Sequence, residues 1–444
     1  MKKVFAVFIL LFISLSLWAQ EEETPDEDSS QEVSTSENEP TPKKKFVMKN
    51  RVFELSLVNL DINFSNNSLT AGDFIRDSKD MKQTGKFFKD PISINLNDFS
   101  NGLIFNFGAT IKPVSLNFNW KDKWGFGLDI GHTNLTGNLQ FSEKLLSFNE
   151  ANDVKLRAGM AVFTDFGIPA FFHVSKFKIK VRPSVFFPLF YTEPTVTYTS
   201  GQVIDPVTGN SGTRFQINYD MRVYYSVFDM QEFGNNGSFV LQDNIWKNLG
   251  FDLSLGVEYP LLNWLDLGVD VINIPLFMAK LNRYMQIDGE AYFDTSKIDI
   301  SGLINGEEIP EDAYGYPEDI EIKYNNDGSK KIYRPFTMLS FAKFKPFKTP
   351  ILSFIPSIGF SINPLYTKLV SIEGGLSVRL DLANIFITTI GVNYNDRKWK
   401  NSVDFVLNLR AFELDLGISF QSPDFVKSFQ GAGFGVSAGL KFGW

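Results

Sequence analysis

The chain has 444 residues, of which 43% are hydrophobic and 15% aromatic, with 43 basic and 51 acidic residues that give a formal net charge of −8. The acidic balance argues against nucleic acid as a partner, because a phosphate backbone requires a basic surface. The absence of cysteine excludes disulfides and thiol catalysis, and with only two histidines we expect no metal site and no cofactor.

The first 45 residues are typical of an exported protein with a solvated tail. In residues 1–19, Lys2 and Lys3 precede an apolar run and Ala19 fits a cleavage site, so we predict a signal peptide that is removed on export. Residues 20–45 carry nine acidic residues, three prolines and many Ser and Thr residues. This composition cannot bury a core, and we predict a disordered tail.

Residues 46–102 are predicted to contain the first strand, a plug, or both. Residues 52–64 alternate between apolar and polar side chains, as a strand does. Residues 65–100 alternate weakly and are interrupted by two glycines and a proline, which suits a plug or a loop equally.

Residues 103–444 alternate between apolar and polar side chains over many short segments. The clearest are residues 215–227, 249–259, 265–271, 376–382, 403–409 and 412–420. Period two indicates a strand with one apolar and one polar face, and the runs approach the roughly 9–11 residues of a tilted membrane-spanning strand. We therefore predict an all-β fold, a transmembrane antiparallel β-barrel, with a secreted β-sandwich as the alternative.

The strand count leaves two possibilities, 14 or 16. Counting back from the C-terminus gives nine strands from residue 249 onward. Seven further segments lie upstream, near 52–64, 103–109, 114–120, 124–131, 154–163, 176–184 and 215–227. Both totals are even, as closed single-chain barrels usually are. Fourteen follows if the residues before about Phe105 fold inward as a plug instead of joining the wall.

The segment 274–334 is predicted to leave the barrel as one long external excursion. It holds twelve acidic residues between Asp288 and Asp327. The ordered acidic spacing of a calcium-binding EF-hand is absent, so we expect a solvated surface loop.

Aromatic residues mark the last strand and the ends of several others. The final strand places apolar residues on one face and resembles the C-terminal assembly signal of bacterial outer-membrane barrels: Phe434, Val436, Leu440, Phe442 and Trp444. Four tryptophans at strand ends predict an aromatic girdle: Trp120, Trp124, Trp264 and Trp399. We therefore expect the lipid bilayer and the outer-membrane barrel assembly machinery as partners.

A basic ladder is the strongest candidate for a binding site. Lys176, Lys178, Lys180 and Arg182 occupy alternate positions, and we expect them to face the lumen. Arg222 and Arg379 are predicted at inner positions of other strands. These charges either neutralise carboxylates on neighbouring strands or form a constriction or a carboxylate site for an amphiphilic solute.

His173 and Ser175 form the one candidate for catalysis. Two residues apart on a strand, they would share a face, and we expect that face to be the lipid side. The pair resembles the His-x-Ser of the outer-membrane phospholipase A family, but Lys176 and Phe177 stand where that family has Asn-Gly. We expect no enzymatic activity.

As a whole, the chain resembles the long-chain fatty-acid transporter family of outer-membrane barrels. Its size, the count of 14 strands, the N-terminal plug region and the terminal aromatic strand carry the resemblance. The resemblance implies uptake of hydrophobic molecules through a plugged barrel that opens laterally into the membrane. We therefore expect a bacterial outer-membrane protein for passive uptake of small hydrophobic or amphipathic solutes. The alternatives are a surface barrel for adhesion or structure, and a lipid-facing hydrolase.

Overall fold

The computed structural model describes residues 51–67, 103–120, 123–141, 153–204, 209, 211–231, 240–242, 245–297, 310–315, 322–326, 328, 330–347, 351–365, 369–395, 397–409 and 411–443. The predicted signal peptide, the acidic tail, most of the weakly alternating segment before residue 103, and Trp444 lie outside these residues. Within the described residues, no helix is long and apolar enough to cross a membrane.

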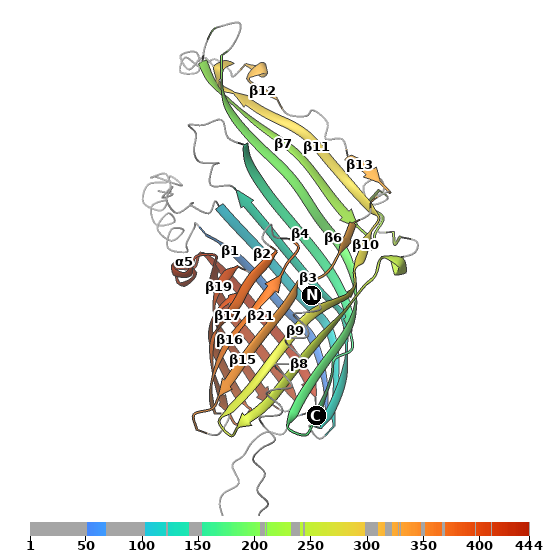
Figure 1. Cartoon of the computed structure of the whole chain (residues 1–444), viewed down its shortest axis with the longest axis vertical. Coiled ribbons are helices and arrows are strands. Elements are labelled where there is room, and N and C mark those ends of the chain that lie inside the picture. The colour runs from blue at the N-terminus through green and yellow to red at the C-terminus, as the bar shows by residue number, and fades with distance from the viewer. Residues whose placement is uncertain are drawn as a thin grey trace, which may run out of the picture. The chain divides into compact units, whose positions relative to one another are not determined.

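Fourteen antiparallel wall positions close into a barrel (Figure 1). The wall strands are β1 (Phe53–Asn66), β2 (Leu103–Trp120), β3 (Trp124–Phe141), β4 (Asp153–Gly167), β5 (Ala170–Val174), β6 (Phe177–Ile204), β8 (Gly250–Leu262), β9 (Leu265–Phe277), β15 (Phe336–Phe344), β16 (Leu352–Ile362), β17 (Val370–Leu382), β18 (Phe386–Asn395), β19 (Lys398–Leu409), β20 (Phe412–Ser422) and β21 (Gly433–Gly443). β4 and β5 share one position between β3 and β6, and β21 pairs with β1 to close the wall.

The wall has fourteen positions, as one of the two predicted totals, but they are not filled by the segments that this total assumed. The segments 103–109 and 114–120 are one continuous strand, β2, which runs through Pro113. The segment 215–227 forms β7 (Ser211–Tyr225), which pairs with β6 and β11 and takes no position in the closed wall. β1, by contrast, is a wall strand.

Side-chain alternation gives the wall an apolar outside and a polar inside. Opposite residues of an antiparallel pair lie on the same face of a sheet, and the register pairs Phe64 with Phe434 and Ser65 with Gly433. Ser65 is buried, whereas Phe434 is 58% exposed. The apolar residues therefore cover the outside and small polar residues face inward, which reverses the pattern of a water-soluble sheet packed on a core.

An external sheet continues from the wall on one side. We use this name for residues Phe190–Ile204 of β6 together with β7, β11 (Arg283–Asp294), β12 (Tyr314–Gly315) and β13 (Ile322–Asn325). The first half of β6 pairs with β8 in the wall and its second half pairs with β7. In Figure 1 the wall strand β6 and the external strands β7 and β11 extend well beyond the rest of the wall. The described parts of the predicted loop 274–334 thus include strands.

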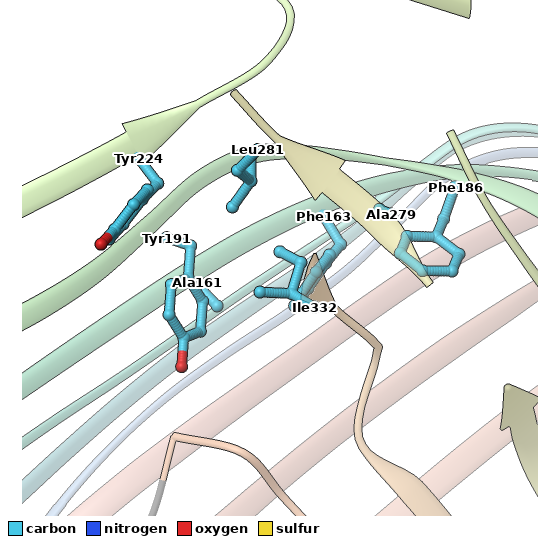
Figure 2. Close-up of a cluster of buried hydrophobic side chains, with 8 residues drawn as sticks. All are labelled: Ala161, Phe163, Phe186, Tyr191, Tyr224, Ala279, Leu281 and Ile332. Atoms are coloured by element: carbon cyan, nitrogen blue, oxygen red, sulfur yellow. The ribbon is translucent and has the colours of Figure 1, made fainter. Parts of the chain in front are cut away.

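Two short strands from the same excursion form an inner plug. β10 (Ala279–Leu281) and β14 (Lys330–Ile332) pair with each other in a separate two-stranded sheet. Figure 2 shows Ala279, Leu281 and Ile332 among side chains from β4, β6 and β7. The buried cluster that they form with these strands contains Ala161, Phe163, Phe186, Tyr191 and Tyr224. The inner plug is therefore held by hydrophobic packing against the inward face of β4 and β6.

Short helices complete the described structure. They are η3 (Ile245–Asn248), η4 (Thr295–Lys297), η5 (Glu311–Ala313) and α5 (Phe425–Phe429). In α5 the Asp424 carboxylate caps the helix by accepting a hydrogen bond from the Lys427 backbone N–H at 2.9 Å.

Candidate functional site in the barrel lumen

A chamber of about 580 Å³ lies within the wall strands. It combines charged and amide side chains with apolar ones. The polar lining includes Arg51, Glu54, Asn117, Asn119, Lys178, Lys180, Arg182, Asp270, Asn408 and Glu413, and the aromatic ring of Phe171 lies on the same inward face as Lys180. The chamber also touches Phe118, Phe126, Val181 and Val271, which the strand registers place at outward positions. Such a lining suits a small solute with one charged or polar end and an apolar body.

The basic ladder lies on β6, and three of its members line the chamber: Lys178, Lys180 and Arg182. Lys180 forms an ion pair with Glu258 on β8. Arg182 donates to Asp129 at 2.7 Å through Nε and to Asp165 at 2.5 Å through Nη2. The charges of these two residues are therefore matched across neighbouring strands.

Lys178 differs from its two neighbours on the ladder. Its ammonium group lies 5.5 Å from the centroid of the Phe171 ring. Among the described residues, no carboxylate oxygen lies within 4 Å of it. Lys178 thus presents a cation and an aromatic ring side by side on the chamber wall.

The remaining predicted cations lie elsewhere. Lys176 is in the turn between β5 and β6 and does not line the chamber. Arg379, on β17, donates to Asp381 at 3.2 Å. Arg222 lies on β7 in the external sheet and donates to Asp220 at 3.2 Å, so its predicted inner wall position is wrong because β7 leaves the wall.

The predicted lipid-facing dyad is not formed. His173 is opposite Lys178 in the β5–β6 register, whereas Val174 is opposite Phe177. His173 therefore shares the lumen face with Lys178. Ser175 lies in the turn that follows, with φ of 54°. The expectation failed because the strand ends before Ser175, so the two side chains do not share a strand face.

A group of paired charges that the sequence analysis did not predict continues from Arg182 toward the inner plug. Its centre is Arg334, which donates to Asp252 through Nε at 2.7 Å and through Nη2 at 2.7 Å. Nη2 also donates to the Ser184 hydroxyl at 2.8 Å, and Nη1 bonds to Asp165. The side chains of Asp165 and Asp252 are each 1% exposed and that of Arg334 is 6% exposed.

Asp165 has further partners in this group. His132 Nδ1 lies 2.9 Å from Asp165 Oδ2, and Arg182 donates to Oδ1. Asp252 has Arg334 as its cation and also accepts a hydrogen bond from Ser184. We use the name ionic layer for Arg334, Asp165, Asp252, Arg182, Asp129 and His132.

β6 places chamber, ionic layer and inner plug in sequence. Lys178 and Lys180 line the chamber, Arg182 belongs to both the chamber lining and the ionic layer, and Phe186 belongs to the cluster around the inner plug. The Arg334 guanidinium lies 5.3 Å from the centroid of the Phe186 ring. Alternate residues of one strand thus connect all three features.

The wall has an irregularity next to the chamber, at the junction of β4 and β5. β3 pairs with β4 up to Gly167 and with β5 from Ala170, and the register shifts between Asp129 and His132. Across the junction Gly127 donates its backbone N–H to the Pro169 carbonyl at 2.7 Å. Phe126, Pro169 and Ala170 all line the chamber.

Tryptophans lie at both ends of the wall strands. Trp120 and Trp124 stack at 6.4 Å across the β2–β3 turn, and Trp264 packs edge-on against Phe344 at 5.0 Å. Trp399, at the β18–β19 turn, packs against Phe425 of α5 at 4.8 Å. On the last strand the outward-facing Phe434, Val436 and Phe442 are exposed.

Comparison with known proteins gives similarities at the level of structure. No protein-family model and no curated protein matches the chain. The toluene transporter TodX of P. putida matches with a TM-score of 0.44 at 9% identity, over 88% of this chain and 90% of TodX. The chain resembles the long-chain fatty-acid transporter (FadL) family in architecture.

Two further structures show the same likeness. The toluene transporter TbuX of Ralstonia pickettii has a TM-score of 0.40 at 6% identity, over 89% of this chain and 90% of TbuX. A FadL homologue of Pseudomonas aeruginosa has a TM-score of 0.34 at 11% identity, over 88% and 89%. Scores and identities this low show a distant likeness of fold alone.

Proposed function

We propose that the protein is an outer-membrane barrel for passive uptake of small amphipathic solutes. A closed barrel satisfies every backbone hydrogen bond of its wall without exposing a sheet edge, which is the condition for a β-structure to lie in lipid. The exposed apolar outside and the tryptophans at both strand ends support a membrane position.

The chamber is the observation that carries the transport role. Its volume of about 580 Å³ falls within the roughly 300–1,000 Å³ typical of small-molecule sites. A surface barrel used only for adhesion would need no internal chamber of mixed polarity. The hydrolase alternative loses its support because His173 faces the lumen.

We infer an anionic amphiphile as the preferred solute. Lys180 and Arg182 are already paired with carboxylates, whereas Lys178 offers a cation beside the Phe171 ring. A carboxylate bound by Lys178 would place its apolar body against Phe171. Uptake needs no energy source if the solute moves down its gradient.

The junction of β4 and β5 supports a route from the chamber to the membrane. Where β3 meets Ile168 and Pro169, the wall changes register and is bridged by the hydrogen bond from Gly127 to Pro169, and Phe126 and Ala170 line the chamber there. An apolar solute leaving at this point would enter lipid without crossing the lower half of the lumen.

Calorimetric titration of the purified barrel with 2-naphthoate tests the solute class. We expect Lys178→Gln to weaken binding at least ten-fold, because it removes the cation that faces the carboxylate. Lys176→Gln, in the adjacent turn, is the matched control and should bind normally. The neutral 2-naphthamide should bind equally to wild type and Lys178→Gln. Equal 2-naphthoate affinities for the two lysine variants would refute the assignment.

The external sheet supports one second role, which is surface binding. Phe293, Tyr314 and Ile322 on its strands are exposed. A variant without residues 288–325 would lose binding to a surface partner but retain solute binding in the chamber. Loss of 2-naphthoate binding in that variant, with the barrel folded, would count against the separation of the two roles.

A further inference from the structure

Arg334 continues the chain from β14, one of the two strands of the inner plug, across the lumen. Arg334 follows β14 by two residues and precedes β15 by two. β15 is bonded to β9, β9 to β8, β8 to β6 and β6 to β4. The partners of Arg334 are Asp252 on β8, Ser184 on β6 and Asp165 on β4, which are two, three and four wall positions away from β15. The segment that carries Arg334 therefore reaches across the lumen rather than following the wall.

Two different forces hold this segment. Above the ionic layer, Ala279, Leu281 and Ile332 are almost fully buried against the inward face of β4 and β6. At its end, the Arg334 guanidinium uses all three of its nitrogens on two carboxylates and a hydroxyl. Only three of the six residues in the two short strands, Ala279, Leu281 and Ile332, are apolar, and the other three are lysines. Their hydrophobic contact is modest, so the ionic contact determines whether the segment stays in place.

We propose that Arg334 is the latch of a gate, and that the inner plug closes the chamber toward the external sheet until Arg334 leaves Asp252 and Asp165. This inference rests on the proposed transport function and adds its regulation. On release Asp165 keeps Arg182 and His132, whereas Asp252 keeps only the Ser184 hydroxyl among the described residues. Opening therefore requires water or a cation to reach Asp252, which makes the closed state the stable one.

The external sheet is connected directly to this gate. Only Asn282 separates β10 from β11, and the Gly328 backbone N–H donates to the Asn282 carbonyl at 2.9 Å. A shift of β11 is therefore transmitted to β10 and through the β10–β14 pairing to Arg334. When a solute or surface molecule binds the external sheet and shifts β11, this connection favours opening of the gate.

Single-channel recording of an Arg334→Cys variant tests the latch. The sequence contains no cysteine, so a thiol reagent modifies only the introduced residue. We expect wild type to open rarely and Arg334→Cys to open at least ten-fold more often. A cationic methanethiosulfonate, which restores a positive charge at the position, should return openings close to the wild-type frequency, whereas an anionic one should not. Folding is checked by the heat-dependent gel shift of closed barrels.

Two outcomes overturn the proposal. One is a folded Arg334→Cys barrel that opens as rarely as wild type, and the other is an equal response to the two reagents. If Arg334→Cys does not fold, the uncharged pair Asp252→Asn with Arg334→Gln is recorded instead, with the same expected increase in openings and the same refuting result.

A variant in which a short Gly-Ser linker replaces residues 279–334 separates failure of the latch from failure of transport. If this barrel conducts while the Arg334 variants stay closed, the latch is wrong and the proposed function stands. If every folded variant is silent and none takes up solute, the proposed function itself is wrong.

Discussion

Replacing Arg334 with Met should be among the most destabilising single substitutions in the lumen. The substitution removes four hydrogen bonds, made to Asp252, Asp165 and Ser184. Removing one partner of a buried ion pair costs about 3–5 kcal/mol. Because Asp165 retains Arg182, the uncompensated charge is mainly that of Asp252, and we expect a loss of about 3 kcal/mol, the lower end of that range.

A double-mutant cycle isolates this charge. Asp252→Asn in the Arg334→Met background removes the unpaired carboxylate, so the double variant should be more stable than Arg334→Met alone, with a coupling of about 2 kcal/mol. Arg379→Met is the matched control, because Arg379 is 36% exposed and pairs with Asp381 on its own strand at 3.2 Å. Loss of such a partly exposed pair costs at most about 1 kcal/mol.

Equilibrium guanidinium unfolding in detergent, followed by tryptophan fluorescence, measures these differences. If Arg334→Met costs no more than Arg379→Met, or if the double variant is no more stable than Arg334→Met, the ionic layer does not hold the plug.

Three further variants test other parts of the structure. A Cβ at Gly250 would overlap the ring of the fully buried Phe186, so Gly250→Ala should cost about 1–3 kcal/mol in thermal or guanidinium unfolding, and an unchanged midpoint would contradict the packing. Glu413 accepts a hydrogen bond from Lys441 at 2.5 Å near the closing strands, and Glu413→Gln should lower the temperature of the heat-dependent gel shift; an unchanged temperature would show that this bond contributes little. Burial, with a nearby carboxylate, raises the pKa of Tyr225 to about 12 from its ordinary value of 10, so stability should fall as pH rises from 10 toward 12. Tyr225→Phe should remove one late-ionising phenol from an ultraviolet titration; an unchanged curve would refute the burial.

The wall could be predicted from the sequence because its physical cause is local. A strand with lipid on one side and a polar lumen on the other must alternate with period two, and the segments from residue 249 to 443 that alternate are wall strands in the structure. The same rule cannot say which alternating segment leaves the wall. β7 alternates as the wall strands do, yet it pairs in the external sheet because β6 is 28 residues long and offers a second partner edge there.

The lumen was predicted only in part. The inward position of Lys178, Lys180 and Arg182 follows from alternation along β6, and the pairing of Lys180 and Arg182 with carboxylates is the neutralisation that charges inside a barrel favour.

The ionic layer could not be found this way. Arg334 lies in the short connection between β14 and β15, where no periodic pattern marks its position. Its partners Asp252 and Asp165 are 82 and 169 residues away in sequence. β10 and β14 are three residues each, too short to show a period at all. Long-range side-chain contacts of this kind depend on closure of the barrel.

Flux of 2-naphthoate into vesicles that contain the folded protein tests the central claim most directly. At pH 8 the solute is ionised, so a bilayer without protein admits it slowly. We predict a flux that rises in proportion to inserted wild-type barrel, falls in Lys178→Gln, and rises further in Arg334→Cys. A flux equal to that of protein-free vesicles for every folded variant would contradict a role in solute uptake.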